Sequence, residues 1–448
     1  MNLHLNSLVI RNFRCFSECD VTFQERLTVL IADNGRGKST IMDAAALILA
    51  QFVDELTGGR QSDGIAKGDV RLARLEDNPA VPRTPSHLEC SVNIDAVEVS
   101  WIRERRKFEK QTRRSPKSIS GLLDAISTVK AGLLATDEEL LLPVVAYYPS
   151  TRFSSSGYFG DRKHRKPPIL IGRLDGYRGF LDPLSDSRHF NEWYEQKVAA
   201  VKKHAPTGAA REGSALQQLT AVRVAVNGVL EPTGWGQIDW DQTQQCVVAE
   251  HPVQGRLPLA SLSSGVRNMV AMTADLAHRC ARLNPALGED AARRTTGIVL
   301  IDEVDLHLHP SWQQRVVGLL RDAFPCIQFI LSTHSPQVLS TVHADCIRIV
   351  KLCDGDGQVE TPQFQTRGVE SADVLATIMN VDPVPRVEEA EWLNRYRALI
   401  EDGTHEGQDG LELRHRLTDH FGLQHPLMLD CDRLIRFSAF KRRAAGGS

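Results

Sequence analysis

A short apolar run, a glycine-containing loop and a long helical stretch follow one another near the N-terminus, and this order limits the folds open to the chain. Leu27–Ile31 is a run of buried-strand type, Ala32–Lys38 is a polar loop, and Ser39–Leu56 has apolar residues around much of its circumference. A loop between a strand and a helix directs backbone N–H groups and the positive end of the helix dipole at an anion. We therefore expect an α/β domain with a phosphate-binding loop.

The residue types in the loop indicate ATP and Mg²⁺ as cofactors. In such a loop Lys38 reaches the β- and γ-phosphates and Ser39 binds the magnesium ion. The usual pattern has glycine at the first position, where this chain has Ala32. Alanine lacks the conformational freedom of glycine, so we expect an adjusted loop entry that still binds nucleotide. The expected nucleotide-binding residues are Asn34, Gly35, Arg36, Gly37, Lys38, Ser39 and Thr40.

Two carboxylates follow an apolar strand far downstream. Gly297–Ile301 reads as a buried strand, and Asp302 and Glu303 come directly after it. One carboxylate at such a strand end suits the coordination shell of Mg²⁺, and the other suits the polarisation of water. We assign the first role to Asp302 and the second to Glu303. With a phosphate-binding loop upstream, this pair predicts nucleotide hydrolysis.

A third motif, Leu262–Arg267 (LSSGVR), precedes a predicted helix over 263–283 and lies shortly before the acidic strand. It resembles the LSGGQ signature of ABC-type ATPases, with Ser264 in place of the first glycine and Val266 in place of glutamine. Ser263 and Gly265 match the signature. The resemblance implies that these two residues meet the γ-phosphate bound by the opposite protomer of a head-to-tail dimer.

Further positions carry the same resemblance. His334 follows the apolar run Ile327–Leu331 and is similar to the switch histidine that senses the γ-phosphate. Arg14 resembles a residue of the nucleotide-side strand, near adenine or phosphate. Tyr147–Arg152 stands where a Q-loop is expected but contains no glutamine, and Arg152 is either a phosphate contact or a surface cation. The stretch 302–310 (DEVDLHLHP) resembles a D-loop region, with zinc binding through His-x-His as the weaker reading.

The motifs in this order resemble the SMC-, RecF- and OLD-like ATPases of bacterial anti-phage defence, and most of all the PtuA ATPases of Septu and retron systems. The resemblance covers about residues 1–50 and 140–385. It implies an ATPase that is the sensor or regulator subunit of a defence complex, is slow and dimer-dependent, and controls a separate HNH nuclease of the PtuB type. One alternative is a RecF-like repair ATPase that binds DNA directly. An OLD-like nuclease is disfavoured because no TOPRIM domain is seen.

Strands that alternate with helices predict a mostly parallel sheet. We expect an α/β fold: an ABC-ATPase head with a mixed α/β insertion and a helical C-terminal tail. The head comprises residues 1–150 and 255–385, the insertion, mostly helical, residues 151–254, and the tail, a candidate surface for a partner, residues 386–448.

Composition excludes several other classes. The net charge of −3 argues against a generally cationic nucleic-acid coat, although Arg103–Lys117 and Arg162–Lys166 are locally basic and are either nucleic-acid contacts or solvated faces. No apolar run approaches the roughly 20 residues of a membrane span, and no leader opens the chain. Nine cysteines without paired spacing indicate free thiols. We expect a cytoplasmic homodimer with no membrane contact.

Overall fold

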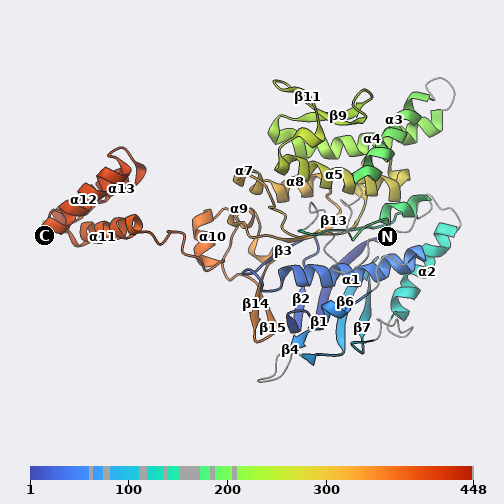
Figure 1. The fold of residues 1–448 in the computed structure, drawn as a ribbon, viewed down its shortest axis with the longest axis horizontal. Helices are drawn as coiled ribbons and strands as arrows, with labels where there is room; N and C mark the ends of the chain where they lie inside the picture. The colour runs from blue at the N-terminus through green and yellow to red at the C-terminus, as the bar shows by residue number, and fades with distance from the viewer. Residues whose placement is uncertain are drawn as a thin grey trace. The chain divides into compact units, whose positions relative to one another are not determined.

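The computed structural model describes residues 1–59, 64–73, 81–109, 119–134, 140–150, 172–181, 187–203 and 209–445 (Figure 1). The chain forms two compact units, Met1–Val374 and Leu375–Ser448. No helix in the described ranges is long and apolar enough to cross a membrane.

The first unit is built on a ten-stranded sheet of order β7-β6-β1-β2-β15-β14-β3-β13-β12-β8. Its parallel half runs from β14 to β8, and its antiparallel half contains β7, β6, β1 and β2. The α/β class predicted from the sequence is therefore confirmed. The strands are β1 (Leu3–Phe13), β2 (Phe16–Thr22), β3 (Leu27–Ile31), β6 (Ser86–Ile94), β7 (Val97–Arg105), β8 (Val144–Tyr148), β12 (Gly297–Ile301), β13 (Ile327–Ser332), β14 (Ile347–Cys353) and β15 (Asp356–Glu360).

Continuous apolar runs place the parallel half in the interior. Every residue of β3, β8, β12 and β13 is buried, as expected for parallel strands covered on both faces. Helix α1 (Lys38–Thr57) lies on one side of these strands, and α5 (Ser264–Leu283) and α8 (Val316–Ala323) lie on the other (Figure 1). Helix α8 is preceded by the short helix α7 (Pro310–Gln313), which ends before α8 begins.

The insertion forms a second layer over α5. Helix α4 (Ala209–Leu230) packs on α5 through small side chains, with Ala221 against Ala281. Helix α3 (Ser187–Lys203) packs on α4, and a three-stranded antiparallel sheet completes the layer. The strands of that sheet are β9 (Gly236–Asp241), β10 (Cys246–His251) and β11 (Gly255–Pro258). The boundary predicted between residues 254 and 255 falls in the turn of the β10–β11 hairpin.

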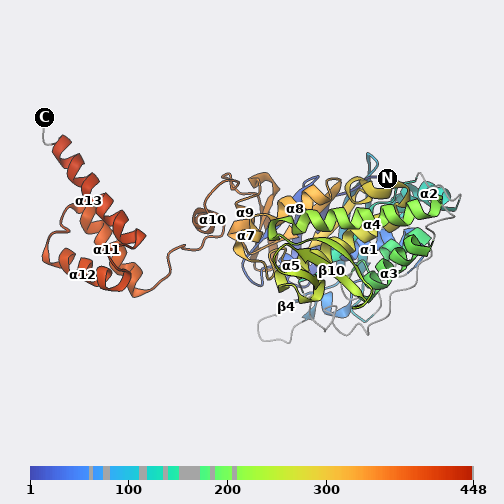
Figure 2. The ribbon, with the colours of Figure 1, turned by 90° about the horizontal axis from the view of Figure 1, so that it is seen from above.

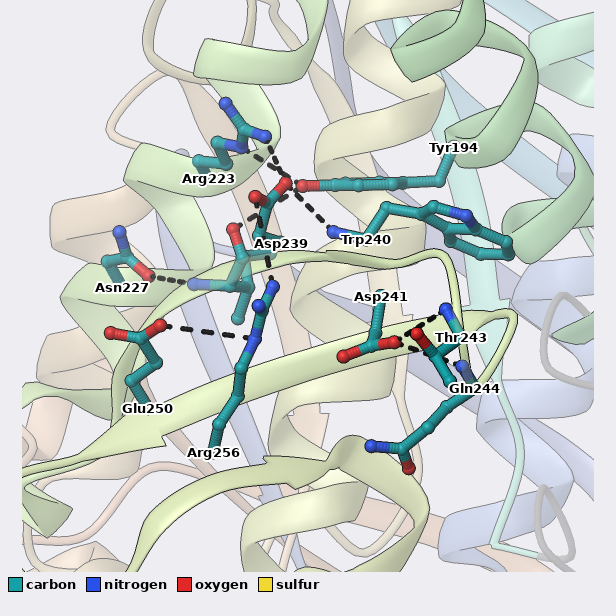
Figure 3. Close-up of polar contacts among 11 residues, drawn as sticks. Tyr194, Arg223, Asn227, Asp239, Trp240, Asp241, Thr243, Gln244, Glu250 and Arg256 are labelled. Carbon is teal, nitrogen blue, oxygen red and sulfur yellow. Dashed lines mark hydrogen bonds and ion pairs between the residues drawn. The ribbon is translucent and has the colours of Figure 1, made fainter.

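Polar contacts join the small sheet to its helices (Figure 3). The Arg223 guanidinium on α4 donates to the Tyr194 hydroxyl at 3.0 Å and to Asp239 on β9 at 2.6 Å. The backbone N–H of Ile238 donates to the Asn227 amide oxygen at 3.3 Å. These contacts join α3, α4 and β9 into one layer.

The second unit contains three helices with a core of their own (Figure 2). They are α11 (Glu388–Asp402), α12 (Gln408–Phe421) and α13 (Pro426–Ala445), so the helical tail predicted from the sequence is confirmed. The buried residues of this core are Leu393, Tyr396, Ile400, Leu413, Leu417, Met428 and Cys431. Other helices and strands in the described ranges are β4 (Leu72–Ala73), β5 (Val81–Pro82), α2 (Ser120–Leu134), α6 (Ala291–Arg294), α9 (Pro336–Leu339) and α10 (Ser371–Thr377).

Asn284 lies at the end of α5 and ties three segments together. Its side-chain oxygen accepts from the N–H of Leu142 at 2.7 Å, and its amide nitrogen donates to the Leu142 carbonyl at 2.8 Å and the Thr295 hydroxyl at 3.0 Å.

Asn284→Ala leaves these buried groups without partners, so we expect the free energy of unfolding to fall by about 2–4 kcal/mol. Chemical denaturation checks this prediction. Gln244→Ala, at an exposed turn of the same unit, is the control and should change the free energy of unfolding by less than about 0.5 kcal/mol. Equal effects of the two variants would contradict it.

Candidate nucleotide-binding site

The phosphate-binding loop joins β3 to α1, as the sequence predicts. Gly35 has φ 75° and Gly37 has φ 98°, values that favour glycine. A Cβ atom at Gly37 would also lie 2.2 Å from the ring of Phe16. The backbone at Ala32 is outside the positive-φ region, so alanine at this position costs no strain. The loop therefore keeps glycine where the conformation needs it.

The start of α1 is suited to an anion. Its N-cap is Gly37, which contributes no side-chain hydrogen bond, so the first N–H groups of this 20-residue helix point toward the loop. Asn34, Gly35 and Arg36 are exposed. The Arg36 guanidinium donates to the Leu352 carbonyl at 3.2 Å, at the end of β14. These features fit the phosphates of a nucleotide.

Lys38 directs its ammonium group inward. Its residue is 6% exposed, and its Nζ donates to the Ala32 carbonyl at 2.7 Å. Burial lowers the pKa of Lys38 from its ordinary value, and the charges of Asp302 and Glu303 act in the opposite direction. The structure thus brings the lysine of the loop to the two carboxylates that the sequence places 264 and 265 residues later.

The acidic pair lies at the carboxyl end of β12, held by the neighbouring strand. The Ser332 hydroxyl, at the end of β13, donates to Asp302 Oδ1, and the Ser332 Oγ atom accepts a hydrogen bond from the N–H of Glu303 at 2.8 Å. Asp302 is 1% exposed, whereas Glu303 is half-buried and has a φ of 50°. Asp302 therefore has a fixed position next to Lys38, and Glu303 is more open. Ser332 was not among the residues predicted for the site.

His334 lies beside the same groups. It follows β13 and is half-buried. Burial and the positive charge of Lys38 lower its pKa from the ordinary value of 6.5, and Asp305 opposes this shift. The Thr333 hydroxyl donates to Asp305, which fixes the backbone between the strand and the histidine. Lys38, Asp302, Glu303 and His334 thus form one group of charged and titratable side chains at neighbouring strand ends.

The signature motif lies at the start of α5. Ser263 is the N-cap residue, and Ser263 and Ser264 are exposed. Gly265, in contrast, is buried. A Cβ atom at this position would lie only 2.6 Å from the carbonyl oxygen of His307, so a larger residue does not fit. This glycine therefore allows α5 to approach the 302–310 stretch of its own chain. In the described part of the chain, no group of three or more His, Cys, Asp and Glu residues could hold a metal ion, so the zinc reading of that stretch has no support there.

Arg14 lies near the loop but is held by carboxylates. Its guanidinium donates to Asp43 and to Asp69, the latter at 3.0 Å from Nε. The adjacent Cys15 thiol lies 3.6 Å from the Thr40 hydroxyl at the start of α1. The structure therefore shows Arg14 in ion pairs, and a nucleotide contact of this residue stays a prediction. Its partner Asp43 was not foreseen, because the two residues are 29 apart in the chain.

Part of the basic stretch is buried. Arg103 and Arg105 are on β7, and their guanidinium groups donate to the carbonyls of Leu47 and Ile65. These two side chains cannot contribute to a phosphate-binding surface. Residues 110–117 of the stretch, the whole of Arg162–Lys166 and Arg152 lie outside the described residues.

The depressed pKa of His334 has a consequence for stability. Below pH 6.5 the histidine of the unfolded chain takes up a proton more readily than the folded one, so the free energy of unfolding falls as the pH drops. Above pH 6.5 both forms are neutral and this contribution is constant. We expect the stability difference between the wild-type chain and His334→Asn to vary with pH only below that value. Denaturation curves of both proteins at several pH values test this prediction. A difference in the free energy of unfolding that stays the same below pH 6.5 would contradict it.

Comparisons with known proteins show what the chain is similar to. An AAA domain model matches residues 7–205, and a second AAA domain model matches residues 242–340. "Retron Vc95 probable ATPase" of Vibrio cholerae serotype O1 biovar El Tor is 26% identical, over 94% of this chain and 88% of that protein. "Retron Ec83 probable ATPase" of Escherichia coli is 25% identical, over 94% of this chain and 84% of that protein.

Two further similarities are narrower or more distant. "Septu protein PtuA" of Bacillus mycoides (strain KBAB4) is 44% identical over 17% of this chain and 10% of that protein. The solved structure of an SMC head bound to the C-winged helix domain of ScpA has a TM-score of 0.49 and 16% identity, over 80% of this chain and 98% of that one. The predicted resemblance is confirmed: the chain is similar to retron ATPases over nearly its whole length and to Septu PtuA over a part of it, and it carries matches to AAA domains.

Proposed function

We propose that this chain is an ABC-type ATPase that binds and hydrolyses ATP with Mg²⁺ and acts in the cytoplasm as the sensor or regulator subunit of an anti-phage defence complex. One observation carries the ATPase part: the buried Lys38 at the end of the loop lies beside Asp302, Glu303 and His334. The defence part is supported by the relatives, which are named as retron ATPases and match 94% of the chain.

Each side chain has a role that follows from its place. The loop backbone at Asn34–Gly37 and the start of α1 at Thr40 hold the phosphates, Lys38 neutralises their charge, and Ser39 and Asp302 hold the metal. The bound magnesium ion supplies charge stabilisation to the phosphates. Glu303, which is half-buried, orients the attacking water, and His334 contacts the γ-phosphate. Positioning and charge stabilisation provide most of the catalysis in phosphoryl transfer.

A second copy of the chain completes the site. Ser263 and Ser264 are exposed at the start of α5, a helix of 20 residues, and the N-cap residue Ser263 makes no side-chain hydrogen bond to the helix. The first N–H groups of α5 therefore lack a side-chain cap and suit an anion. We propose that two chains meet head to tail, so that Ser263 of each contacts the nucleotide held by the other. Gly265 contributes by keeping α5 close to the carbonyl of His307. Turnover is then slow in the monomer.

The output is the engagement and release of the two heads, which controls a separate HNH nuclease of the PtuB type. The C-terminal unit is the proposed docking part for this partner. It has a core of its own, and Leu423, Phe437 and Phe440 are exposed hydrophobic residues in it. The nuclease partner is what the resemblance to the PtuA ATPases implies, to which the chain is similar over a short range.

Glu303→Gln separates nucleotide binding from hydrolysis. The amide keeps the shape of the side chain but cannot activate water, so we expect turnover to fall by about 10²-fold or more while ATP stays bound. Bound nucleotide after gel filtration and steady-state phosphate release measure the two properties. The trapped state should also stabilise the dimer.

Lys38→Ala provides the complementary result, since it removes the cation that faces the phosphates and should abolish binding. Lys351→Ala is the matched control, because this lysine is exposed and pairs with Glu360 at 2.6 Å on the surface. If Glu303→Gln and Lys38→Ala both keep full turnover, the site assignment is wrong.

Mixed dimers test the contribution of the second chain. Ser263→Arg blocks the signature surface, and Lys38→Ala blocks the loop, so each variant alone should be inactive. In a mixed dimer one composite site combines both lesions and the other carries neither. We expect each mixed dimer in an equimolar mixture to recover one active site and no more, measured as phosphate release. A mixture that stays inactive would contradict the head-to-tail arrangement.

A further inference from the structure

A buried carboxylate that the proposed chemistry does not use lies directly behind the phosphate-binding loop. Asp43 is on α1, one helical turn after Ser39, and is 1% exposed. It accepts a hydrogen bond from the Tyr147 hydroxyl at 2.6 Å and another from the Arg14 guanidinium. A buried carboxylate is costly unless it is paired and hydrogen-bonded, and Asp43 has both kinds of partner.

The three residues join the three elements that surround the site. Arg14 follows β1 and precedes Cys15, whose thiol lies 3.6 Å from the Thr40 hydroxyl in the first turn of α1. Tyr147 is on β8, where it pairs with Leu300 of β12, two residues before Asp302. Asp43 therefore connects the first turn of α1 to the strand that carries the metal-binding carboxylate.

The charges in this region interact through the protein interior. Burial raises the pKa of Asp43, Arg14 lowers it, and the nearby charge of Asp302 raises it. Asp43 and Asp302 are thus two buried carboxylates within electrostatic reach of each other. The positive charge of Arg14 balances the charge of Asp43. The charge of Asp302 faces Lys38 and, in the proposed function, the metal ion. Arg14 also forms an ion pair with Asp69, so a contact with a phosphate would break its ion pairs with two carboxylates.

We propose that Tyr147, Asp43 and Arg14 are positioning residues that fix the first turn of α1 relative to β12, so that Ser39 and Asp302 can bind one Mg²⁺–ATP. This inference rests on the proposed function and assigns Arg14 to the support of the loop in place of direct nucleotide contact. The side chains act through α1 and β8 and do not touch the nucleotide.

The chain offers a matched control on the same strand. Tyr148 follows Tyr147 and points to the opposite face of the sheet, since side chains alternate along a strand. Its hydroxyl donates to Asp275 on α5 at 2.8 Å, and Asp275 is paired with Arg279 at 2.8 Å. Tyr147→Phe and Tyr148→Phe therefore each remove one buried hydroxyl that donates to a paired carboxylate on a helix. The two changes differ in which helix is affected.

The experiment compares these two variants in the full chain. Binding of a fluorescent ATP analogue is titrated with Mg²⁺, and the melting temperature is measured in parallel. We expect both variants to lower the melting temperature by similar amounts. Tyr147→Phe should raise the Mg²⁺ concentration for half-maximal binding about tenfold, from the loss of a hydrogen bond to a charged group, and Tyr148→Phe should leave it unchanged. Equal half-saturation in both variants would overturn the inference.

Arginine substitutions separate support from contact. Arg14→Lys keeps the charge beside Asp43, so it should retain most Mg²⁺-dependent binding, whereas Arg14→Gln should shift the half-saturation in the same direction as Tyr147→Phe. If Arg14→Gln weakens binding of the analogue equally with and without Mg²⁺, Arg14 contacts the nucleotide and the inference is wrong.

Lys38→Ala distinguishes a failure of the inference from a failure of the proposed function. Loss of binding in Lys38→Ala together with wild-type behaviour of Tyr147→Phe overturns the inference alone. Full binding of the analogue by Lys38→Ala overturns the proposed function and the inference with it.

Discussion

The buried ammonium group of Lys38 is the constraint on which the arrangement of the sheet depends. An isolated charge in a protein interior costs several kcal/mol, so a lysine that is 6% exposed needs carboxylates beside it. Those carboxylates, Asp302 and Glu303, are far away along the chain. Parallel strands bring their carboxyl ends to one edge of a sheet, and β3, β13 and β12 are parallel neighbours. The middle strand contributes Ser332, whose hydroxyl bonds to Asp302 and to the backbone of Glu303.

Strand β8 has a similar role at the border of the sheet. Its backbone pairs with β12 on one side, and on the other side the N–H of Tyr147 donates to the Phe180 carbonyl at 2.8 Å. The next residue, Tyr148, reaches Asp275 on α5, and the Arg279 guanidinium beside it donates to the carbonyls of Gly176 and Arg178. The segment after residue 171 is therefore fastened to the same strand that contacts α1. An edge strand without such cover would leave backbone groups unpaired.

The sequence was informative where a local pattern has one physical meaning. The apolar runs of β3, β12 and β13 and the loop before Lys38 were predicted because continuous hydrophobic strands and glycine-containing turns are local signals. Strand β15 was not predicted, since its residues are Asp, Gly, Gln, Val and Glu and only its pairing partners make it a strand. The Asp43–Tyr147 contact joins residues 104 apart in the chain, a distance over which no local pattern carries information.

The two halves of the candidate site differ in how firmly they are built. Asp302 is buried, its N–H donates to the Tyr148 carbonyl at 2.9 Å, and its carboxylate accepts from Ser332. The loop at Asn34–Arg36 is exposed and contains a glycine in the left-handed region, where a Cβ atom would meet nothing within 4 Å. A nucleotide bound at this loop would meet an exposed, glycine-containing backbone, whereas Asp302 already has its hydrogen-bond partners. The two ends of the candidate site therefore differ in exposure and in the protein contacts that hold them.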